Sequence, residues 1–190
     1  MAAAFLLFAS LALAVDFTYW IEPRAGGDAE LAEWALKAWE NKSDGSLRMV
    51  RSPSREAAQL RVIWVNGRDG LYGEARPIVV NGKRGAELHI RPAMDGLGAE
   101  IEAAARKDPL LRDAIVYLTC LHESGHGLGF SHTAGFADIM YSFGYGGDIG
   151  EYFGRYRRKL SVRNDIKKQS GISAADEQNV QHVFGNAERH

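Results

Sequence analysis

The chain has 190 residues, of which 46% are hydrophobic and 25% charged, and its formal net charge is −1. A chain of this length and composition can bury one sizeable core, which excludes an intrinsically disordered protein and predicts a single compact domain. The near-zero net charge produces no overall field that would attract nucleic acid, so we expect no nucleic-acid partner.

The N-terminal segment has the pattern of a targeting sequence. Met1–Ala14 carries no charge, contains an apolar stretch and ends in A-L-A, an A-x-A cleavage pattern. It is shorter than the roughly 20 apolar residues of a membrane-spanning helix, so we expect no stable membrane span. We therefore predict a signal peptide over residues 1–14, export to an extracellular or periplasmic location, and a secreted domain over residues 15–190. Because the segment lacks lysine and arginine, an uncleaved anchor or a misplaced start codon stays open.

The next part of the sequence predicts three strands and one helix. Runs rich in β-branched and aromatic residues predict strands at Phe17–Ile21, Leu47–Val50 and Leu60–Val65. Asp28 is placed to cap a helix that continues to about Asn41. The apolar positions of that helix recur with a period of about 3.6 residues and are expected in the core: Leu31, Trp34, Ala35, Ala38 and Trp39.

A hairpin follows. Ile78–Val80 and Ala86–Ile90 are predicted strands, joined by a glycine-bearing connection over residues 81–85. Pro77, at the start of the first of these, suits an edge strand. Residues 97–107 then have helical character.

Two further helices have clear start signals. Asp108 and Pro109 predict the N-cap and first turn of a long helix, with Leu118 and His122 along one side. Ser173-Ala174-Ala175-Asp176 resembles a capping box for a last helix. That helix is expected to bury Val180, Val183 and Phe184 and to end at Gly185.

The segment HESGHGLGFSH has the pattern H-E-x-x-H-x-x-G-x-x-H. A helix projects His122 and His126 from one face, where they can share a metal. Gly129 can adopt the left-handed conformation that ends the helix and returns His132 to the same metal. Three neutral nitrogens leave the fourth tetrahedral position of Zn²⁺ open for water, which is typical of a catalytic site. Glu123 lies beside the first ligand and can reach a metal-bound water without binding the metal itself.

Residues just after this motif indicate a family. Met140 follows His132 by eight residues, which resembles the Met-turn beneath the zinc of metzincin proteases. Thr133 after the third histidine and Tyr141 after the methionine resemble the matrixins, the family of the matrix metalloproteinase catalytic domains. Astacins and serralysins place a metal-binding tyrosine two residues after the methionine, where this chain has Ser142. The chain therefore resembles a matrixin-like metzincin.

The resemblance extends over about residues 17–185, and its specific part is residues 122–141. It implies an α+β metzincin fold: a twisted, mostly parallel sheet with an antiparallel edge strand, a long active-site helix, a Met-turn and a C-terminal helix. It also implies a zinc metalloendopeptidase that hydrolyses peptide bonds in a polypeptide substrate, and we expect a monomer. In such an enzyme Glu123 takes the proton of the metal-bound water and later delivers it to the leaving amine.

The same resemblance gives expectations for substrate binding. The substrate is expected to lie extended along the predicted edge strand, pairing with Ile78, Val79 and Val80 by β-augmentation. Tyr141 and Leu118 are expected to line an apolar pocket that favours a bulky apolar side chain after the scissile bond. Core packing is the alternative role for Leu118.

The sequence departs from the matrixin pattern in two regions. The loop over residues 66–73, where matrixins hold a structural zinc, contains no histidine, and His89 alone cannot form such a site. We therefore expect one zinc, the catalytic one; a calcium site is unsupported, because no D-x-D-x-D-G loop occurs. An insertion over about residues 143–172 carries a run of basic residues, which we expect to be a solvated face rather than an anion site.

Cys120 is the one cysteine, so no intramolecular disulfide can form. We expect it to be a small buried hydrophobe rather than an inhibitory thiolate, since the sequence shows no propeptide and no switch motif. The length also gives no room for an accessory domain. Two other functions stay open: a binding protein with a non-catalytic zinc site, which the presence of Glu123 disfavours, and a zinc amidase that acts on cell-wall peptides.

Overall fold

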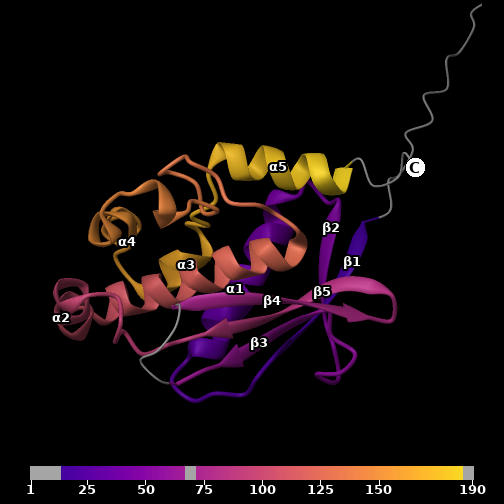
Figure 1. Cartoon of the computed structure of the whole chain (residues 1–190), viewed down its shortest axis with the longest axis horizontal. Helices are drawn as coiled ribbons and strands as arrows, with labels where there is room; N and C mark the ends of the chain where they lie inside the picture. The colour runs from indigo at the N-terminus through magenta and orange to yellow at the C-terminus, as the bar shows by residue number, and fades with distance from the viewer. Residues whose placement is uncertain (1–13, 67–71, 186–190) are drawn as a thin grey trace, which may run out of the picture.

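The computed structural model of the chain describes residues 14–66 and 72–185 (Figure 1). All but the last residue of the predicted signal peptide, residues 1–14, therefore lies outside the described residues, and so do residues 67–71 of the loop over 66–73. None of the described helices has both the length and the apolar composition needed to cross a bilayer.

The described residues form an α+β fold around one five-stranded sheet with the strand order β2-β1-β3-β5-β4. The strands are β1 (Val15–Ile21), β2 (Leu47–Arg51), β3 (Leu60–Trp64), β4 (Gly73–Val80) and β5 (Lys83–Ile90). The α-helices are α1 (Asp28–Lys42), α2 (Ala99–Lys107), α3 (Pro109–Leu128), α4 (Ile149–Arg157) and α5 (Ala174–Gly185). Short 3₁₀ helices cover Phe143–Tyr145 and Arg163–Lys167.

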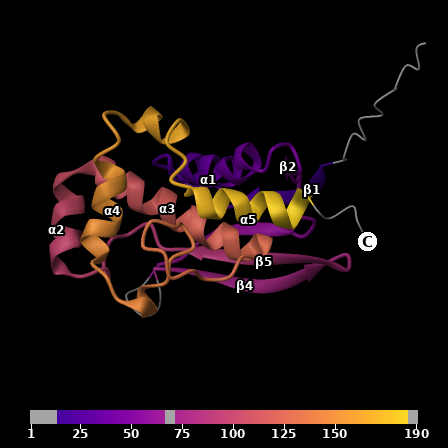
Figure 2. The ribbon, with the colours of Figure 1, turned by 90° about the horizontal axis from the view of Figure 1, so that it is seen from above.

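The sheet is mostly parallel. Strand β1 pairs parallel to β2 and β3, and β3 pairs parallel to β5, whereas β4 pairs antiparallel to β5 at the edge. The predicted α+β class, with a mostly parallel sheet and an antiparallel edge strand, is thereby confirmed. Both views place α1 and α3 on the same face of this sheet, and α2 beside α4 at the end away from the β4–β5 turn (Figures 1 and 2).

The hairpin connection predicted over residues 81–85 is wrong. Val80 pairs directly with Lys83, so the turn has only two residues, Asn81 and Gly82, with φ values of 49° and 74°. Positive φ at both central positions is the geometry of the tight turn that matches the twist of paired strands. Pro77 lies inside β4 and not at its start, and it pairs with Ala86 of β5. Proline is tolerated there because β4 is an edge strand, which does not need a backbone N–H at every position.

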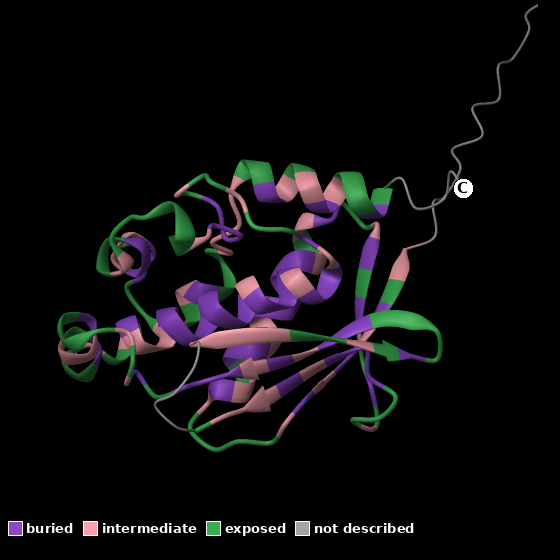
Figure 3. Cartoon of the chain, viewed as in Figure 1, coloured by how far each residue is buried: buried purple, intermediate pink, exposed green. Residues whose placement is uncertain are grey.

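The core lies between the sheet and the two central helices, where Figure 3 shows the buried residues. Trp39 is fully buried, as predicted, and its indole N–H donates to the Leu121 carbonyl at 3.0 Å, which joins α1 to α3. Trp34 is only partly buried: its ring lies at the core margin, with the Arg163 guanidinium carbon 4.8 Å from the ring centroid.

The cap predicted for α1 is also wrong. Gly27, with φ 85°, holds the N-cap position, and no side chain caps the helix there. The Asp28 carboxylate instead accepts bonds from Arg24, at 2.9 Å, and from Arg112 of α3. A buried carboxylate needs charged partners, and the guanidinium of a distant helix satisfies that need better than the local backbone.

The caps of the other two helices are as predicted. Asp108 accepts hydrogen bonds from the N–H groups of Leu110 and Leu111 at 3.1 and 3.2 Å. At the start of α5, the Ser173 hydroxyl accepts from the Asp176 N–H, and the Asp176 carboxylate accepts from the Ser173 N–H, both at 3.1 Å. Along α5, Val180 and Phe184 are buried as expected, but Val183 is 42% exposed, so its predicted burial is wrong.

The insertion packs onto the ends of α1 and α3 through its basic residues. Arg157 donates to Asp108 at 2.7 Å, and Arg163 donates to Asp113 at 2.9 Å and also to Glu30. For Arg157 and Arg163 the expectation of a solvated basic face is therefore wrong, because these side chains fasten the insertion to the helices.

Candidate metal centre

Helix α3 carries two of the predicted ligands one turn apart and ends where the sequence predicts. Gly129 adopts a left-handed conformation with φ 107°, and its N–H donates to the His126 carbonyl at 3.0 Å. The Phe130 N–H donates to the Gly125 carbonyl at 2.9 Å, which completes the helix end. The chain then reverses and brings His132 beside His122 and His126.

The three imidazoles converge through their Nε2 atoms. The separations are 3.2 Å between His122 and His126, 3.1 Å between His126 and His132, and 3.3 Å between His132 and His122. Ligands at roughly 2.0–2.1 Å from one tetrahedral metal lie about 3.3 Å apart. The spacing therefore fits three nitrogen ligands of a single ion.

Backbone carbonyls fix the orientation of two rings. The Nδ1 atoms of His122 and His126 lie 2.7 Å from the Ile139 carbonyl and 2.9 Å from the Phe130 carbonyl. A carbonyl can only accept, so each Nδ1 carries the proton and each neutral ring turns an Nε2 lone pair to the centre. Lone pairs this close together need a cation between them. Burial lowers the pKa of His122 to about 4 and also lowers that of His126, so both rings are neutral at pH 7.

Met140 lies directly against α3 between the two helical ligands. Its side chain is fully buried, and a Cβ added at Gly125 would lie 2.4 Å from its sulfur. Glycine at position 125 is therefore what allows the close approach. The Thr133 N–H donates to the Met140 carbonyl at 2.9 Å, so the segments after His132 and around Met140 are bonded to each other.

The cap of α5 contributes to the same centre. The Asp176 carboxylate accepts from the Ile139 N–H at 2.7 Å, and the carbonyl of Ile139 is the group that orients His122. Ser173 in turn donates to Asp138 at 2.8 Å. The capping box was recognised in the sequence, but this second role was missed, because local spacing does not indicate which distant loop a cap will contact.

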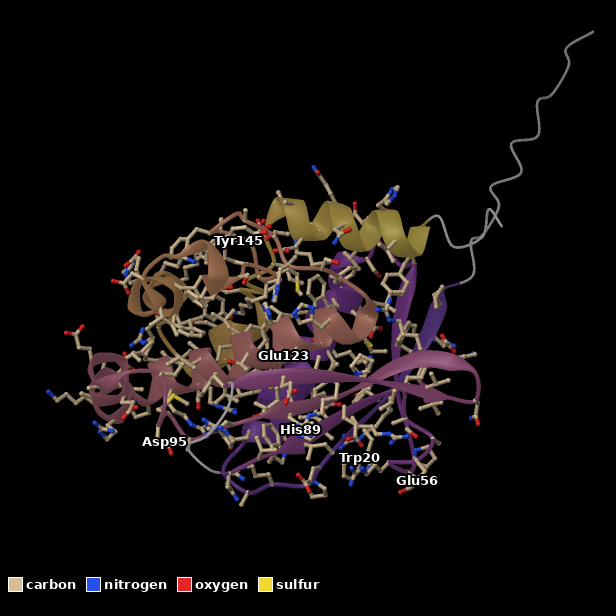
Figure 4. The ribbon with its side chains drawn as sticks, viewed as in Figure 1. Trp20, Glu56, His89, Asp95, Glu123 and Tyr145 are labelled. Carbon is tan, nitrogen blue, oxygen red and sulfur yellow. The ribbon has the colours of Figure 1, made fainter. Side chains whose placement is uncertain are left out.

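Glu123 lies on the α3 face turned toward β4, where Figure 4 labels it. Its side chain is 7% exposed, and it has a hydrogen bond with the Ala75 backbone. A Cβ at Gly73 would lie 2.6 Å from a Glu123 carboxylate oxygen, so a glycine on the strand makes room for the carboxylate. Burial raises the pKa of Glu123 to about 7, against the opposite effect of the Ala75 bond.

The residues predicted for substrate binding separate into different places. Leu118 lines a cavity of about 210 Å³ between α3 and α4, together with Tyr152. Tyr141 does not line this cavity; it is 5% exposed, and its hydroxyl donates to the Gly146 carbonyl at 2.6 Å.

The predicted substrate strand lies within β4, but the β4 residues that share a cavity with a histidine come before it. A second cavity, of about 340 Å³, is lined by His126 together with Ala75 and Pro77. Ile78, Val79 and Val80 lie farther along, toward the hairpin turn, and Val79 is 75% exposed.

The two remaining residues that the sequence singled out, His89 and Cys120, lie outside the metal centre. His89 lies on β5, with its Nε2 3.5 Å from the Glu87 carboxylate, and it is not part of the group formed by His122, His126 and His132. Cys120 is buried, as predicted, and burial raises the pKa of its thiol, which keeps it protonated and unreactive.

No model of a known protein family matches this chain, and no curated protein sequence does either.

Proposed function

We propose that this chain is a secreted zinc-dependent metalloendopeptidase of the metzincin group, similar to the matrixins. The observation that carries the proposal is the convergence of three imidazole Nε2 atoms within 3.3 Å of one another, with the buried carboxylate of Glu123 next to the first ligand. Among the described residues no fourth histidine, cysteine or carboxylate joins the group. Three protein ligands are typical of catalytic zinc, whereas structural zinc sites have four.

Several features support the finer assignment of a metzincin fold. The edge strand β4 is antiparallel to an otherwise parallel sheet, α3 carries the ligands, and Met140 packs beneath them before the last helix. The proposal of export rests on the sequence of Met1–Ala14.

The chemistry that follows is hydrolysis of a peptide bond. A bound zinc would lower the pKa of a coordinated water toward roughly 7 and polarise the scissile carbonyl. With zinc bound, the Glu123 carboxylate would accept a proton from that water while the water oxygen forms the new bond to the carbonyl carbon. The same carboxyl group then protonates the leaving amine as the C–N bond breaks.

The edge of the sheet supports an extended substrate. Among the described strands, β4 pairs only with β5, so its other edge has backbone groups free to bond a peptide. Ala75 on this strand contacts Glu123, so a peptide paired with β4 passes the proposed general base.

Cleavage of a quenched-fluorescence peptide library tests the proposal. We expect the chain to cleave peptides, a zinc chelator to abolish cleavage, and added zinc to restore it. Glu123→Ala should keep the metal but lose about 10²–10⁴-fold in rate. Glu100→Ala, on the exposed face of α2, is the matched control and should cleave normally.

The possible outcomes separate the candidate functions. A protein that binds zinc but cleaves no peptide and no amide would be a metal-site binding protein. Cleavage confined to cell-wall peptides would indicate a zinc amidase. Full activity of Glu123→Ala with its metal in place would contradict the proposed mechanism.

A further inference from the structure

The cavity between α3 and α4 adjoins the metal centre. It has a volume of about 210 Å³, with Leu118 and Ile139 among its apolar lining residues and Tyr152 and Tyr156 as its aromatic side. Leu118 lies one helical turn before His122 on α3, and the Ile139 carbonyl accepts the His122 hydrogen bond at 2.7 Å. Two of the lining residues are therefore next to the proposed metal ligand His122: Ile139 through a hydrogen bond and Leu118 through one turn of helix. A side chain next to a scissile bond held at the metal is therefore within reach of this cavity.

Two cationic side chains also line the cavity, Arg155 of α4 and Lys159 just beyond its end. The Arg155 guanidinium carbon lies 4.5 Å from the ring centroid of Tyr152 and 4.9 Å from that of Phe136. Stacking on these rings holds the guanidinium in place without neutralising its charge.

The other arginines of the insertion have carboxylate partners. Arg157 pairs with Asp108 at 2.7 Å, and Arg158 pairs with Glu151. Within the described part of the chain, no ion pair joins Arg155 or Lys159 to a carboxylate. Arg155 and Lys159 therefore leave positive charge at the cavity.

Carboxylates near the cavity are engaged elsewhere. None of the described residues that line it is acidic. Behind Tyr152, Asp138 accepts from the Ser173 hydroxyl at 2.8 Å, and Asp176 accepts from the Ile139 N–H at 2.7 Å. Glu151 is bound by both terminal nitrogens of Arg158. The described residues around the cavity therefore offer no free carboxylate to pair with Arg155 or Lys159.

We infer that this cavity selects an acidic side chain, glutamate rather than aspartate, directly after the scissile bond. The inference rests on the proposed function and replaces the expected preference for a bulky apolar residue. An apolar side chain would displace water from Arg155 and Lys159 without pairing either charge, which is costly. A carboxylate gains charge-assisted hydrogen bonds instead. An engineered cavity of about 150 Å³ holds benzene, so 210 Å³ accommodates the longer glutamate side chain, whose carboxylate reaches deeper than that of aspartate.

Peptides that differ only in the residue after the cut test this inference. We expect kcat/KM for glutamate to exceed that for glutamine by about ten- to a hundredfold, the range for hydrogen bonds to charged groups, and to exceed that for leucine. The ratio of kcat/KM for glutamate to that for glutamine should fall toward one in the double variant Arg155→Met, Lys159→Met. Lys159→Glu alone should reduce it too, and the exposure of Lys159 lets this variant fold. Lys168→Met, which removes an exposed cation of the insertion outside the cavity lining, is the control and should keep the ratio of the wild type.

Binding of the same peptides to the Glu123→Ala variant separates this inference from the proposed function. Tighter binding of the glutamate peptide than the glutamine peptide, lost when Arg155 and Lys159 are both replaced by methionine, would support the cavity assignment even if the wild type cleaved nothing. Cleavage with equal rates for glutamate, glutamine and leucine would overturn the cavity assignment and leave the peptidase proposal intact. A glutamate preference that survives both substitutions would also overturn it.

Discussion

The metal centre and the cavity beside it are neighbours that arise differently from the sequence. The three ligands lie within His122–His132, and the carbonyls that orient two of them belong to Phe130 and Ile139. The cavity is lined from separate segments: α3, the loop at residues 137–139, α4 with the residue beyond it, and Gly171. The geometry of the metal centre is therefore specified by short-range spacing, whereas the shape and lining of the cavity depend on how distant segments pack.

The two regions should also respond differently to substitution. If one of the three histidines is lost, no other described residue is placed to replace it as a metal ligand. The cavity wall is formed by residues from several segments, so the replacement of one of them should change the cleavage rate or the stability only partly.

Loss of one ligand should abolish metal binding. We expect His126→Ala to contain no zinc by elemental analysis and to cleave no peptide, because two imidazoles do not hold the ion. Added metal stabilises a folded protein by about 2.7 kcal/mol at a hundredfold excess over Kd, so zinc should raise the unfolding temperature of the wild type but not of the variant. His89→Ala, which removes a histidine 3.5 Å from Glu87 on β5, should keep its zinc. Stoichiometric zinc in His126→Ala would contradict the assigned ligand set.

Truncation of Met140 tests the support beneath the ligands. Met140→Ala removes a fully buried side chain that fills the space over Gly125, and should lower the free energy of unfolding by about 2–5 kcal/mol. Met140→Leu conserves most of the volume and should cost less than about 1.5 kcal/mol. Chemical denaturation of the metal-free proteins measures both. Equal stability of the alanine variant and the wild type would show that Met140 is not packed as described.

The sequence predicts the metal centre better than its surroundings for a physical reason. The cap at Asp108, the reversal at Gly129 and the spacing to Met140 depend on bonds between residues close in sequence, which local patterns report. At Asp28 the local capping rule fails, because Arg112, 84 residues away, competes for the carboxylate. Local rules contain no information on such partners.

Other differences have the same origin. Asn81-Gly82 is itself a strong signal for a two-residue turn, and a longer connection was expected only because the strand ends were placed too far apart. The cavity cations Arg155 and Lys159 were visible as part of a basic run. Which members of that run pair with Asp108 or Asp113 depends on packing, so the sequence could not separate them from Arg157 and Arg163.

Loss of the contacts that fasten the insertion to α1 and α3 should lower the stability moderately. Arg163→Ala removes the bonds to Asp113 and Glu30 and the stacking on Trp34. Because the arginine is partly exposed, we expect a loss of about 1 kcal/mol in the free energy of unfolding, with zinc content unchanged. A double-mutant cycle with Asp113→Ala measures the share due to that pair. Loss of zinc in Arg163→Ala would mean that the stability of the metal centre depends on the contacts of the insertion.

The smallest expected effect concerns Asp108, which joins the insertion to α3. Burial raises the pKa of its carboxyl, but the bonds from Arg157 and from the Leu111 and Leu110 N–H groups outweigh this, so the pKa lies below its ordinary value of 3.8. Asn caps a helix about as well as Asp, so Asp108→Asn should lose only the charge interactions, about 0.3–1 kcal/mol at neutral pH. A lowered folded-state pKa stabilises the protein above the unfolded pKa, and this contribution is lost as pH falls through the folded value. The difference between wild type and Asp108→Asn, measured by urea denaturation, should therefore be constant near neutral pH and shrink below pH 3.8. A difference that grew on acidification would show that the carboxyl is not held in its charged form by Arg157.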